Sequence, residues 1–346
     1  MPAKAKSNDM KAKTMKAIVR SEYGSADVLR LEQIDKPVVG DNDVLVRVHA
    51  ASVCKGDVHI LTGKPYLFRL MIGLRRPKNH RFGQDVAGRV EAVGNNVTTV
   101  RPGDDVYGKM SLGALGGFAE YACAPAENFA PKPANLSYAQ AAAVSDSGIT
   151  ALQGLRDTGN LQPGQKVLIN GASGGIGTFA IQIAKALGAE VTAVCSTRHV
   201  SKVSSIGADH IVDYTKEDFV ARGPQHDIML DLVGNRSLAD CKRVLKPKGV
   251  YVACACDPAG DWIGHIVWQL SLLLANTLAS QKIASFLMRP RREDLVDLNA
   301  LIEAGKVIPV IERHYPLSEA AEAVRHVARG HAQGKTVIDV FACGGQ

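Results

Sequence analysis

A glycine-rich segment between an apolar run and a helical run is the clearest chemical signal in the sequence. VLIN (167–170) is followed by GASGGIG (171–177), a variant of the G-x-G-x-x-G pattern in which Ala172 replaces the first glycine. Glycines in such a turn let backbone N–H groups approach a pyrophosphate, which then lies at the positive end of the helix. A helix and then a second strand follow the glycines at the spacing of a dinucleotide-binding unit, which favours such a site over a plain turn. The predicted cradle comprises Ser173, Gly174, Gly175, Ile176 and Gly177.

The end of the next strand indicates which dinucleotide is bound. In NAD-binding proteins a carboxylate about 20 residues after the glycines binds the ribose 2′-hydroxyl. Here the strand ends at Cys195 and is followed by Ser196, Thr197 and Arg198, whereas Glu190 stands at its other end. A hydroxyl and a guanidinium suit a 2′-phosphate, because arginine offers paired donors to phosphate oxygens. The sequence predicts NADPH, the alternative being that Arg198 is a solvated surface residue.

The segment RFGQDVAGRVEAVG (81–94) raises the question of a metal. Gln84 and Asp85 adjoin a glycine there, and other side chains able to bind zinc precede them: Cys54, Asp57, His59 and His80. A catalytic zinc needs three protein ligands of nitrogen, sulfur or oxygen type. Glutamine is a poor ligand because its amide oxygen is neutral. From the residues alone, a metal site and a turn-and-strand scaffold both remain open.

The first part of the chain is predicted to be β structure. Val44, Val46 and Val48 alternate with other residues in DVLVRVHAAS (43–52), which is typical of a half-buried strand. Turn-forming segments such as VGDND (39–43) and RPGDDVYG (101–108) separate runs of this kind. The pattern predicts an antiparallel barrel or sandwich.

From Ser137, the predicted N-cap of an alanine-rich helix, buried strands alternate with helices. The strands are expected at 166–170, 190–195, 210–214, 227–233, 250–256 and 282–288. Their uniform hydrophobicity is typical of parallel strands covered on both faces, so we predict a doubly wound six-stranded α/β sheet. After a helix around Asp294–Ala304, short β segments return. The expected division is a basic tail (1–14), a β domain (15–136), a dinucleotide-binding domain (137–304) and a return to the β domain (305–346).

Composition bounds the class of protein. The chain has 346 residues, 46% of them hydrophobic, and a net charge of +7, as expected for a soluble protein of two domains. Five lysines and one aspartate lie within the first sixteen residues, so much of the charge belongs to a tail and we expect no nucleic-acid partner. The tail lacks the apolar core of a secretory signal, and the seven cysteines are scattered, which favours a cytoplasmic location.

The stretch Trp262–Gln281 contains no Lys, Arg, Asp or Glu and is long enough to cross a membrane. Polar residues recur in it every few positions. We therefore expect a helix buried in protein or lining a pocket, with no membrane span.

Motifs spread over the chain carry a resemblance to a known family: ADVLRLEQIDKPVVGDNDVLVRVHAASVCKGD (26–57), GQDVAGRVEAVG (83–94), GASGGIG, IGADHIVDY (206–214), DLVG (231–234) and GKTVIDV (334–340). From Met15 onward the chain resembles the medium-chain dehydrogenase/reductase family, in its zinc-free quinone oxidoreductase branch. The resemblance implies a GroES-like antiparallel β domain, a Rossmann domain and a homodimer.

The same resemblance implies the metal content. Zinc alcohol dehydrogenases of the family have histidine and glutamate where this chain has Gln84 and Asp85. Their first cysteine ligand matches Cys54, their third ligand falls near Asp146, and their four-cysteine lobe is missing here. We therefore expect no metal.

The resemblance also implies positions around the cofactor and the substrate. Thr150 is placed near the nicotinamide, Tyr214 near the adenosine, and Val233 at the end of the fourth strand. Cys54 and Tyr66 are candidates for the substrate pocket, the alternatives being a buried thiol and an ordinary half-buried aromatic ring.

The expected reaction follows from the absence of a Lewis acid. Hydride from NADPH then needs an acceptor with its own electron sink, such as a quinone or an α,β-unsaturated carbonyl. Two alternatives stay open: a zinc-dependent alcohol dehydrogenase, and a sensor or membrane-associated protein that binds NADPH without turnover.

Overall fold

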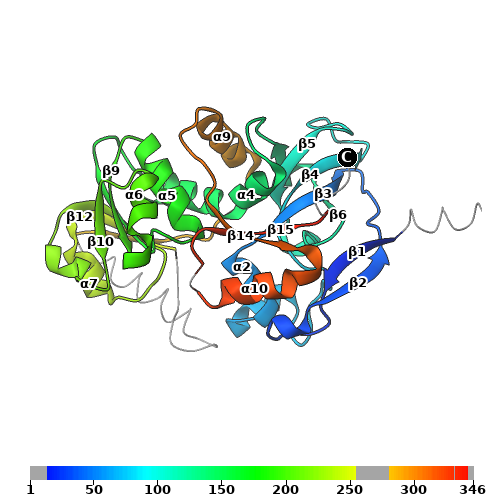
Figure 1. Ribbon diagram of the computed structural model, residues 1–346, viewed down its shortest axis with the longest axis horizontal. Helices are drawn as coiled ribbons and strands as arrows, with labels where there is room; N and C mark the ends of the chain where they lie inside the picture. The colour runs from blue at the N-terminus through cyan, green and yellow to red at the C-terminus, as the bar shows by residue number, and fades with distance from the viewer. Residues whose placement is uncertain (1–13, 255–279, 331, 342–346) are drawn as a thin grey trace, which may run out of the picture.

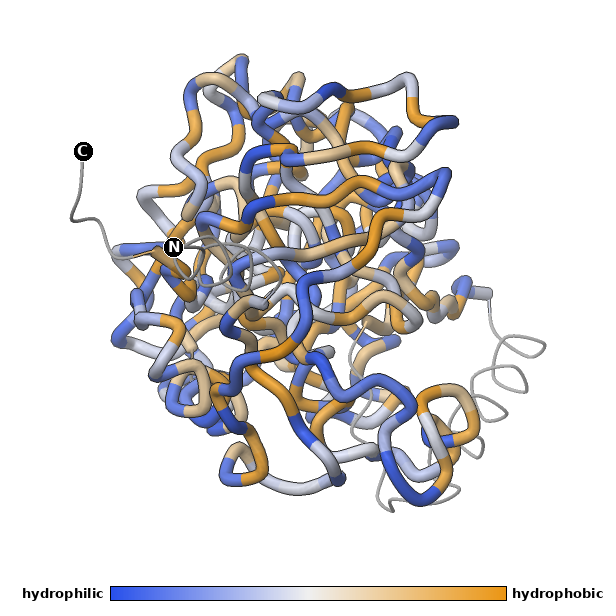
Figure 2. The backbone as a smooth tube through the Cα atoms, turned by 90° about the vertical axis from the view of Figure 1, so that its right-hand side faces the viewer, coloured by the Kyte–Doolittle hydropathy of each residue, from blue (hydrophilic) through white to orange (hydrophobic). Residues whose placement is uncertain are grey.

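The computed structural model describes residues 14–254, 280–330 and 332–341. Two large sheets lie side by side, each in its own domain (Figure 1). In Figure 2 the apolar stretches follow the strands, and hydrophilic stretches occupy many of the turns at the periphery. The expected fold class, an antiparallel β domain beside a parallel doubly wound sheet, is confirmed.

The first domain is built on a seven-stranded sheet in the order β14-β15-β3-β4-β5-β7, with β6 also paired to β3 and a separate hairpin β1-β2. Its strands are β1 (Thr14–Val19), β2 (Arg30–Asp35), β3 (Asp43–Val53), β4 (Asp85–Val93), β5 (Asp105–Lys109), β6 (Tyr121–Pro125), β7 (Phe129–Pro131), β14 (Ile311–Pro316) and β15 (Lys335–Asp339). Its helices include α2 (Lys55–Thr62), η2 (Tyr66–Phe68), α3 (Arg69–Ile72) and α10 (Ala320–Ala328). Val44, Val46 and Val48 are fully buried, as their alternation predicts. The late strand β15 pairs antiparallel with β3, so the end of the chain rejoins this sheet.

The second domain is a parallel sheet of six strands in the order β10-β9-β8-β11-β12-β13, as expected for a Rossmann fold. The strands are β8 (Lys166–Asn170), β9 (Glu190–Cys195), β10 (His210–Asp213), β11 (His226–Asp231), β12 (Leu245–Ala253) and β13 (Lys282–Ser285). The helices include α5 (Gly175–Ala186), α6 (Val200–Ser205) and α7 (Leu238–Arg243). The strand registers bring the carboxyl ends of β10, β9, β8, β11 and β12 to one edge.

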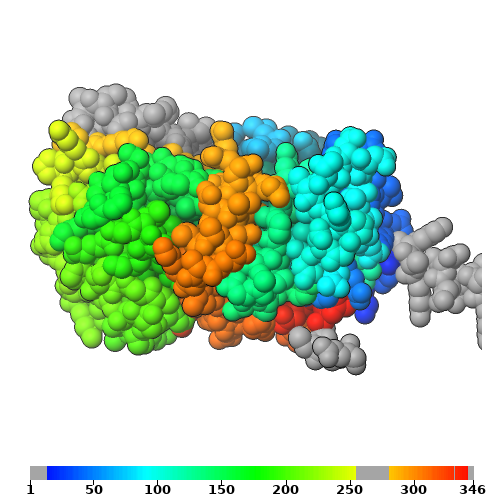
Figure 3. Space-filling view, turned by 90° about the horizontal axis from the view of Figure 1, so that it is seen from above, coloured from blue at the N-terminus to red at the C-terminus, as the bar shows by residue number. Residues whose placement is uncertain are grey.

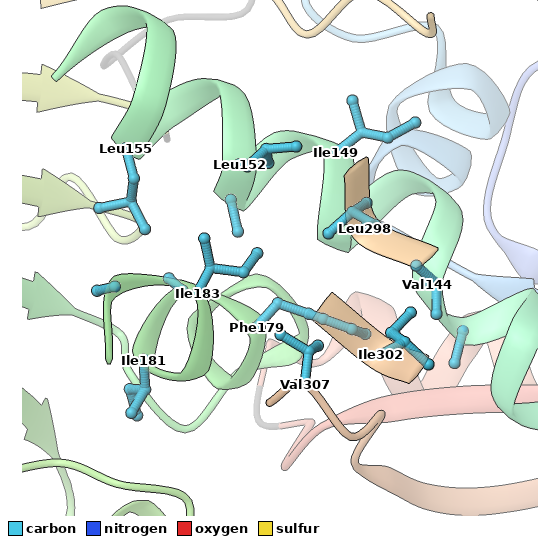
Figure 4. Close-up of a cluster of buried hydrophobic side chains, with 14 of the residues drawn as sticks. Val144, Ile149, Leu152, Leu155, Phe179, Ile181, Ile183, Leu298, Ile302 and Val307 are labelled. Atoms are coloured by element: carbon cyan, nitrogen blue, oxygen red, sulfur yellow. The ribbon is translucent and has the colours of Figure 1, made fainter. Parts of the chain in front are cut away.

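Helix α4 (Tyr138–Leu152) joins the two domains and continues as η5 (Gln153–Thr158). Ser137 caps it in a reciprocal capping box with Gln140, as the sequence predicts. The helix contacts β3, β4, β5 and β15 of the first domain and α5 of the second. Figure 4 shows its apolar side chains interdigitating with those of α5 and of α9 (Arg292–Glu303). In Figure 3, α9 lies across the junction of the two domains.

The apolar stretch Trp262–Gln281 lies outside the described residues except for its last two positions. In the part of the chain that is described, no helix is long and apolar enough to cross a membrane.

Candidate active site

The glycine-rich turn connects β8 to α5 through backbone that other residues would not tolerate. Gly171 has a φ of +85°, in the left-handed region that favours glycine. A Cβ atom at Gly177 would lie 2.3 Å from the carbonyl oxygen of Gly171, so the helix could not approach the turn as closely. Gly174 is the N-cap of α5, whose first residues are Gly175, Ile176 and Gly177. The turn therefore leaves the first amides of α5 facing the carboxyl edge of the sheet, as a pyrophosphate site requires.

Two strands end at this edge next to the turn and hold the residues predicted to select the cofactor. Ser196 follows β9 and is buried, whereas Arg198, two residues later, is exposed. Asp213 ends the neighbouring strand β10, where its carboxylate accepts hydrogen bonds from the hydroxyls of Thr197 (2.5 Å) and Thr215 (2.7 Å). These hydrogen bonds, the one from Thr197 first, lower the pKa of Asp213 to about 2. The carboxylate that ends β10 is thus held by two hydroxyls of the protein.

The fourth strand supplies a turn held by one buried carboxylate. Asp231 accepts hydrogen bonds from the backbone amides of Val233 (3.1 Å) and Gly234 (3.0 Å) and from the side chains of Asn170 (2.9 Å) and Tyr251 (2.9 Å). These bonds fix the ends of β8, β11 and β12 relative to one another.

Two apolar side chains remain exposed at the same edge. Val233 is 40% exposed, and Tyr214, after β10, is 58% exposed. Both were predicted at the cofactor site, and both lie at the carboxyl ends of parallel strands, where ligands of such sheets bind.

Lys335 of the first domain and Ser147 of the joining helix α4 lie beside the glycine-rich turn. A Cβ atom at Gly175 would lie 3.3 Å from Cδ of Lys335 and 3.5 Å from Oγ of Ser147. Lys335 begins β15, and its ammonium group reaches Asp85 at 3.5 Å. Asp85 begins β4 and also accepts a hydrogen bond from Ser52 at 3.0 Å. A chain of contacts therefore links the dinucleotide turn to the segment of Gln84 and Asp85.

Cys54 lies beside that segment, at the N-terminus of α2. The backbone amide of Cys54 donates a hydrogen bond to Asp57 at 2.9 Å. The side-chain amide of Gln84 donates to Asp57 at 3.3 Å and to the Cys54 sulfur at 3.5 Å. Burial, reinforced by the charges of Asp146 and Asp57, raises the pKa of the Cys54 thiol well above its ordinary value. Cys54 is therefore a neutral thiol.

A buried lysine completes this group. The ammonium of Lys109, at the end of β5, lies 2.5 Å from Asp146 and 4.0 Å from Asp85. Burial alone would lower the pKa of Lys109, but the charges of Asp146 and Asp85 outweigh burial and raise it. Burial likewise opposes the charge of Asp146, and Lys109 outweighs that effect and lowers the pKa of the carboxyl. The pair is thus a fixed ammonium and a fixed carboxylate.

Asp85 behaves differently from Asp146. Burial raises its pKa, with Lys335 and Lys109 acting in the opposite direction. Its Oδ1 atom has no hydrogen-bond partner among the described residues, although the side chain is fully buried.

The polar side chains around Cys54 are already engaged with one another. Gln84 directs N–H toward the sulfur, and Asp146 already pairs with the Lys109 ammonium. Within the described ranges, no three or more His, Cys, Asp and Glu side chains form a group that could hold a metal ion.

Thr150 lies one turn after Asp146 on α4, where its hydroxyl donates a hydrogen bond to the Asp146 carbonyl at 2.7 Å. Tyr66 lies on η2, half-buried, with the guanidinium of Arg69 4.6 Å from its ring centre. Apart from Thr150, which lies on α4, the residues predicted for the cofactor lie at one sheet edge. Cys54 and Thr150 both lie close to Asp146.

Sequence reasoning missed the two buried lysines. Lys109 and Lys335 stand in VYGKM and GKTVIDV, where a single lysine reads as a strand-end surface residue. A sequence signal did exist, because each lysine directly adjoins the mostly apolar residues of a short strand. Most of those strand residues are buried.

Comparison with known proteins agrees with both domains. Residues 40–134 match the alcohol dehydrogenase GroES-like domain, and residues 206–338 match a domain described as zinc-binding dehydrogenase.

Relatives cover nearly the whole chain. The mitochondrial NAD(P)H oxidoreductase RTN4IP1 of Bos taurus is 33% identical, over 94% of this chain and 89% of the relative. The chloroplastic NADPH-dependent alkenal/one oxidoreductase of Arabidopsis thaliana is also 33% identical, over 94% and 80%.

The solved structure of a quinone oxidoreductase from Coxiella burnetii superposes with a TM-score of 0.84 at 31% identity, over 95% of this chain and 100% of the other. The chain therefore belongs to the medium-chain dehydrogenase/reductase family and is a quinone oxidoreductase-like protein.

Proposed function

We propose that this oxidoreductase uses NADPH to reduce a quinone or an α,β-unsaturated carbonyl without a metal ion. The observation that carries the proposal is the buried Lys109–Asp146 pair beside Cys54, because it supplies a fixed positive charge at positions where zinc enzymes of the family hold their metal. The contacts of Lys335 and Ser147 with Gly175 connect this group to the dinucleotide turn.

The cofactor assignment rests on the sheet edge. Backbone amides at the start of α5 would bind the pyrophosphate, and Tyr214 and Val233 offer apolar surface to the adenine. Arg198 is exposed and would bind the 2′-phosphate. The oxygens of Asp213 already accept hydrogen bonds from Thr197 and Thr215, so this carboxylate is less available to bind the ribose 2′-hydroxyl of NADH. Relatives named for NADPH, such as the alkenal/one oxidoreductase, support this choice.

When bound, NADPH supplies the hydride. The residues of the chain must then stabilise negative charge that develops on the oxygen of the acceptor. Lys109 is the group suited to donate a hydrogen bond to that oxygen, because its charge is fixed and Asp146 positions it. The Cys54 thiol and Thr150 shape the pocket around it. A quinone or an enone delocalises the negative charge itself, so its carbonyl needs no metal ion to polarise it.

A substrate panel tests this function. We expect NADPH oxidation with a benzoquinone, a naphthoquinone, an alkenal or a cyclic enone, and much slower oxidation with a saturated ketone. Elemental analysis of protein purified without chelator is expected to find no stoichiometric zinc. Ketone reduction that is lost on chelation would instead support a zinc alcohol dehydrogenase. NADPH binding with no turnover on the panel would support a sensor.

Three further assignments belong to this proposal. We keep the domain limits at 136/137 and 304/305, which agree with the two sheets. A homodimer and a cytoplasmic location are also proposed, although relatives include mitochondrial and chloroplastic proteins. Sedimentation equilibrium and microscopy of the tagged chain would test them.

A further inference from the structure

The segment after α2 exposes apolar side chains that pack against no described part of the protein's core. Residues 66–72 form a continuous helical stretch made of η2 and α3. Leu67, Leu70 and Met71 follow the i, i+3, i+4 spacing of one helix face, and Leu74 comes just after. These four side chains are 45%, 63%, 62% and 65% exposed, respectively. A surface with so many neighbouring aliphatic side chains marks an interaction site.

The opposite side of the segment anchors it to the domain. Ile72 is buried, and Phe68 packs against the apolar core of the first domain. The Tyr23 hydroxyl donates a hydrogen bond to the carbonyl of Gly73 at 2.5 Å. Arg69 lies over the Tyr23 ring and donates to the carbonyl of Gly63 at 3.0 Å. The exposed side chains therefore sit on a fixed platform, which lies beside α2 (Figure 1).

The charge of this platform has one sign. Residues 58–84 contain six lysines and arginines and no aspartate or glutamate, in a chain whose net charge is +7. Arg75, Arg76 and Lys78 directly follow the exposed apolar side chains and are themselves exposed. None of the three forms an ion pair with any residue that the structure describes.

We propose that residues 67–78 dock the protein on an anionic phospholipid surface. Leu67, Leu70, Met71 and Leu74 would enter the boundary between headgroups and acyl chains, and Arg75, Arg76 and Lys78 would contact lipid phosphates. Aliphatic side chains rimmed by cations are the combination by which peripheral proteins bind such surfaces.

Other occupants fit less well. A symmetric dimer through this face would bring Arg75 and Arg76 of two copies together, and like charges oppose that contact. Nucleic acid would leave four exposed aliphatic side chains without a counterpart. The inference goes beyond the proposed reaction and does not rest on it.

Vesicle cosedimentation of the full chain tests the inference. We expect binding to phosphatidylcholine vesicles that contain phosphatidylglycerol, weak binding to pure phosphatidylcholine, and release by salt. The triple variant Arg75→Gln/Arg76→Gln/Lys78→Gln should bind about a hundredfold more weakly, given the contribution of each basic residue at such a surface. Leu70→Ser/Met71→Ser/Leu74→Ser should lose at least about tenfold.

Matched controls separate this surface from general charge and from the basic tail. Lys216→Gln/Arg243→Gln/Arg329→Gln removes the same charge from exposed sites elsewhere, and Val38→Ser/Ile308→Ser removes exposed apolar groups elsewhere. Both should bind like the wild type. Hydrogen exchange should slow within 66–78 when anionic vesicles are added. Equal binding of all variants would assign the affinity to the tail and overturn the proposal, as would no preference for anionic lipid.

Discussion

At the scale of single residues, the carboxyl groups near Cys54 show how burial and a neighbouring cation together determine whether a group is charged. Asp146 and Asp85 are both buried, yet Asp146 holds its charge because Lys109 lies 2.5 Å away, whereas burial dominates at Asp85. A buried cation without such a partner would be costly to maintain. The pair therefore provides a positive charge that stays fixed while the substrate changes.

Replacement of Lys109 tests its role in catalysis. Lys109→Met should lower kcat with a benzoquinone about a hundredfold, the usual loss when a donor to a developing oxyanion is removed. The KM for NADPH should change little, since Lys109 is proposed to contact the oxygen of the acceptor and not the cofactor. Steady-state kinetics separate these effects.

The single variant also leaves Asp146 buried without its cation, so folding must be controlled. Lys109→Met/Asp146→Asn removes both charges and should fold better than the single variant while remaining slow. Lys166→Met, which removes a surface partner of Glu190, is the matched control. Wild-type kcat in the double variant would contradict the role of Lys109.

Arg198 carries the prediction on cofactor choice. Arg198→Ala should weaken NADPH binding about ten- to hundredfold by removing a phosphate contact, and should leave NADH binding unchanged. Dissociation constants for both reduced cofactors, measured by titration of intrinsic fluorescence, check this. Arg222→Ala, which breaks a surface ion pair with Glu217, is the control. An equal loss for both cofactors would instead indicate that Arg198 supports the fold.

The sequence marks the glycine-rich turn more clearly than the charged group near Cys54. Gly177 and Gly171 are visible because their backbone positions exclude other residue types. The roles of Lys109 and Lys335 depend on partners 37 and 250 residues away, which no local pattern reveals.

At the scale of elements, the parallel sheet was predictable because each strand is a short uniform apolar run bounded by turns. Strand β8 has the expected bounds, and β9 matches as well. β12 begins at Leu245, before the expected start at 250, because Lys246 and Lys248 interrupt the apolar pattern. The strand is irregular at this point, with a φ of +68° at Lys248 and a shift in the pairing register with β11. The hydrophobic pattern shows which side chains are buried. The strand itself is defined by backbone pairing, which continues past the buried residues.

A buried histidine links three of these elements. His226 on β11 lies within hydrogen-bond distance of the Thr192 hydroxyl on β9 (3.1 Å) and of the Val244 carbonyl (3.3 Å). Burial lowers the pKa of His226 below its ordinary value of 6.5. The unfolded chain therefore takes up a proton at a higher pH than the folded protein.

This difference predicts a pH dependence of stability. The stabilisation linked to neutral His226 is complete above about pH 6.5 and declines as the pH falls toward the folded pKa. His226→Gln cannot take up this proton, so its free energy of unfolding should fall less between pH 6.5 and 5. Urea unfolding at several pH values measures the slope. His314→Gln, at an exposed histidine, should keep the wild-type slope, and an unchanged slope in His226→Gln would contradict the assignment.

At the scale of the whole molecule, the junction of the domains is a continuous core. One apolar cluster includes Ala50, Ala87 and Val337 of the first domain together with α4, α5 and α9. The Tyr107 hydroxyl of β5 lies within hydrogen-bond distance of two acceptors on α9, the Leu295 carbonyl (3.1 Å) and Oδ1 of Asn299 (2.7 Å). Such a junction was not predictable from the domain limits, because its contacts join segments nearly 200 residues apart.

We expect this junction to make the two domains unfold together. Thermal unfolding should show one transition. Its midpoint should be the same by far-ultraviolet circular dichroism and by the fluorescence of a dye that binds exposed apolar surface. Tyr107→Phe keeps the buried ring but removes the hydroxyl that bonds to α9, which should cost about 0.5–1.5 kcal/mol and lower the midpoint. Tyr121→Phe, at a ring that packs against Lys36, is the matched control and should change the midpoint little. The buried Asp294 of α9 also binds Arg156 and Gln153, so α9 stays attached when the Tyr107 hydroxyl is removed. The variant should therefore lower the midpoint and still show a single transition. Two resolved transitions in the wild-type protein would show instead that the shared core does not couple the domains.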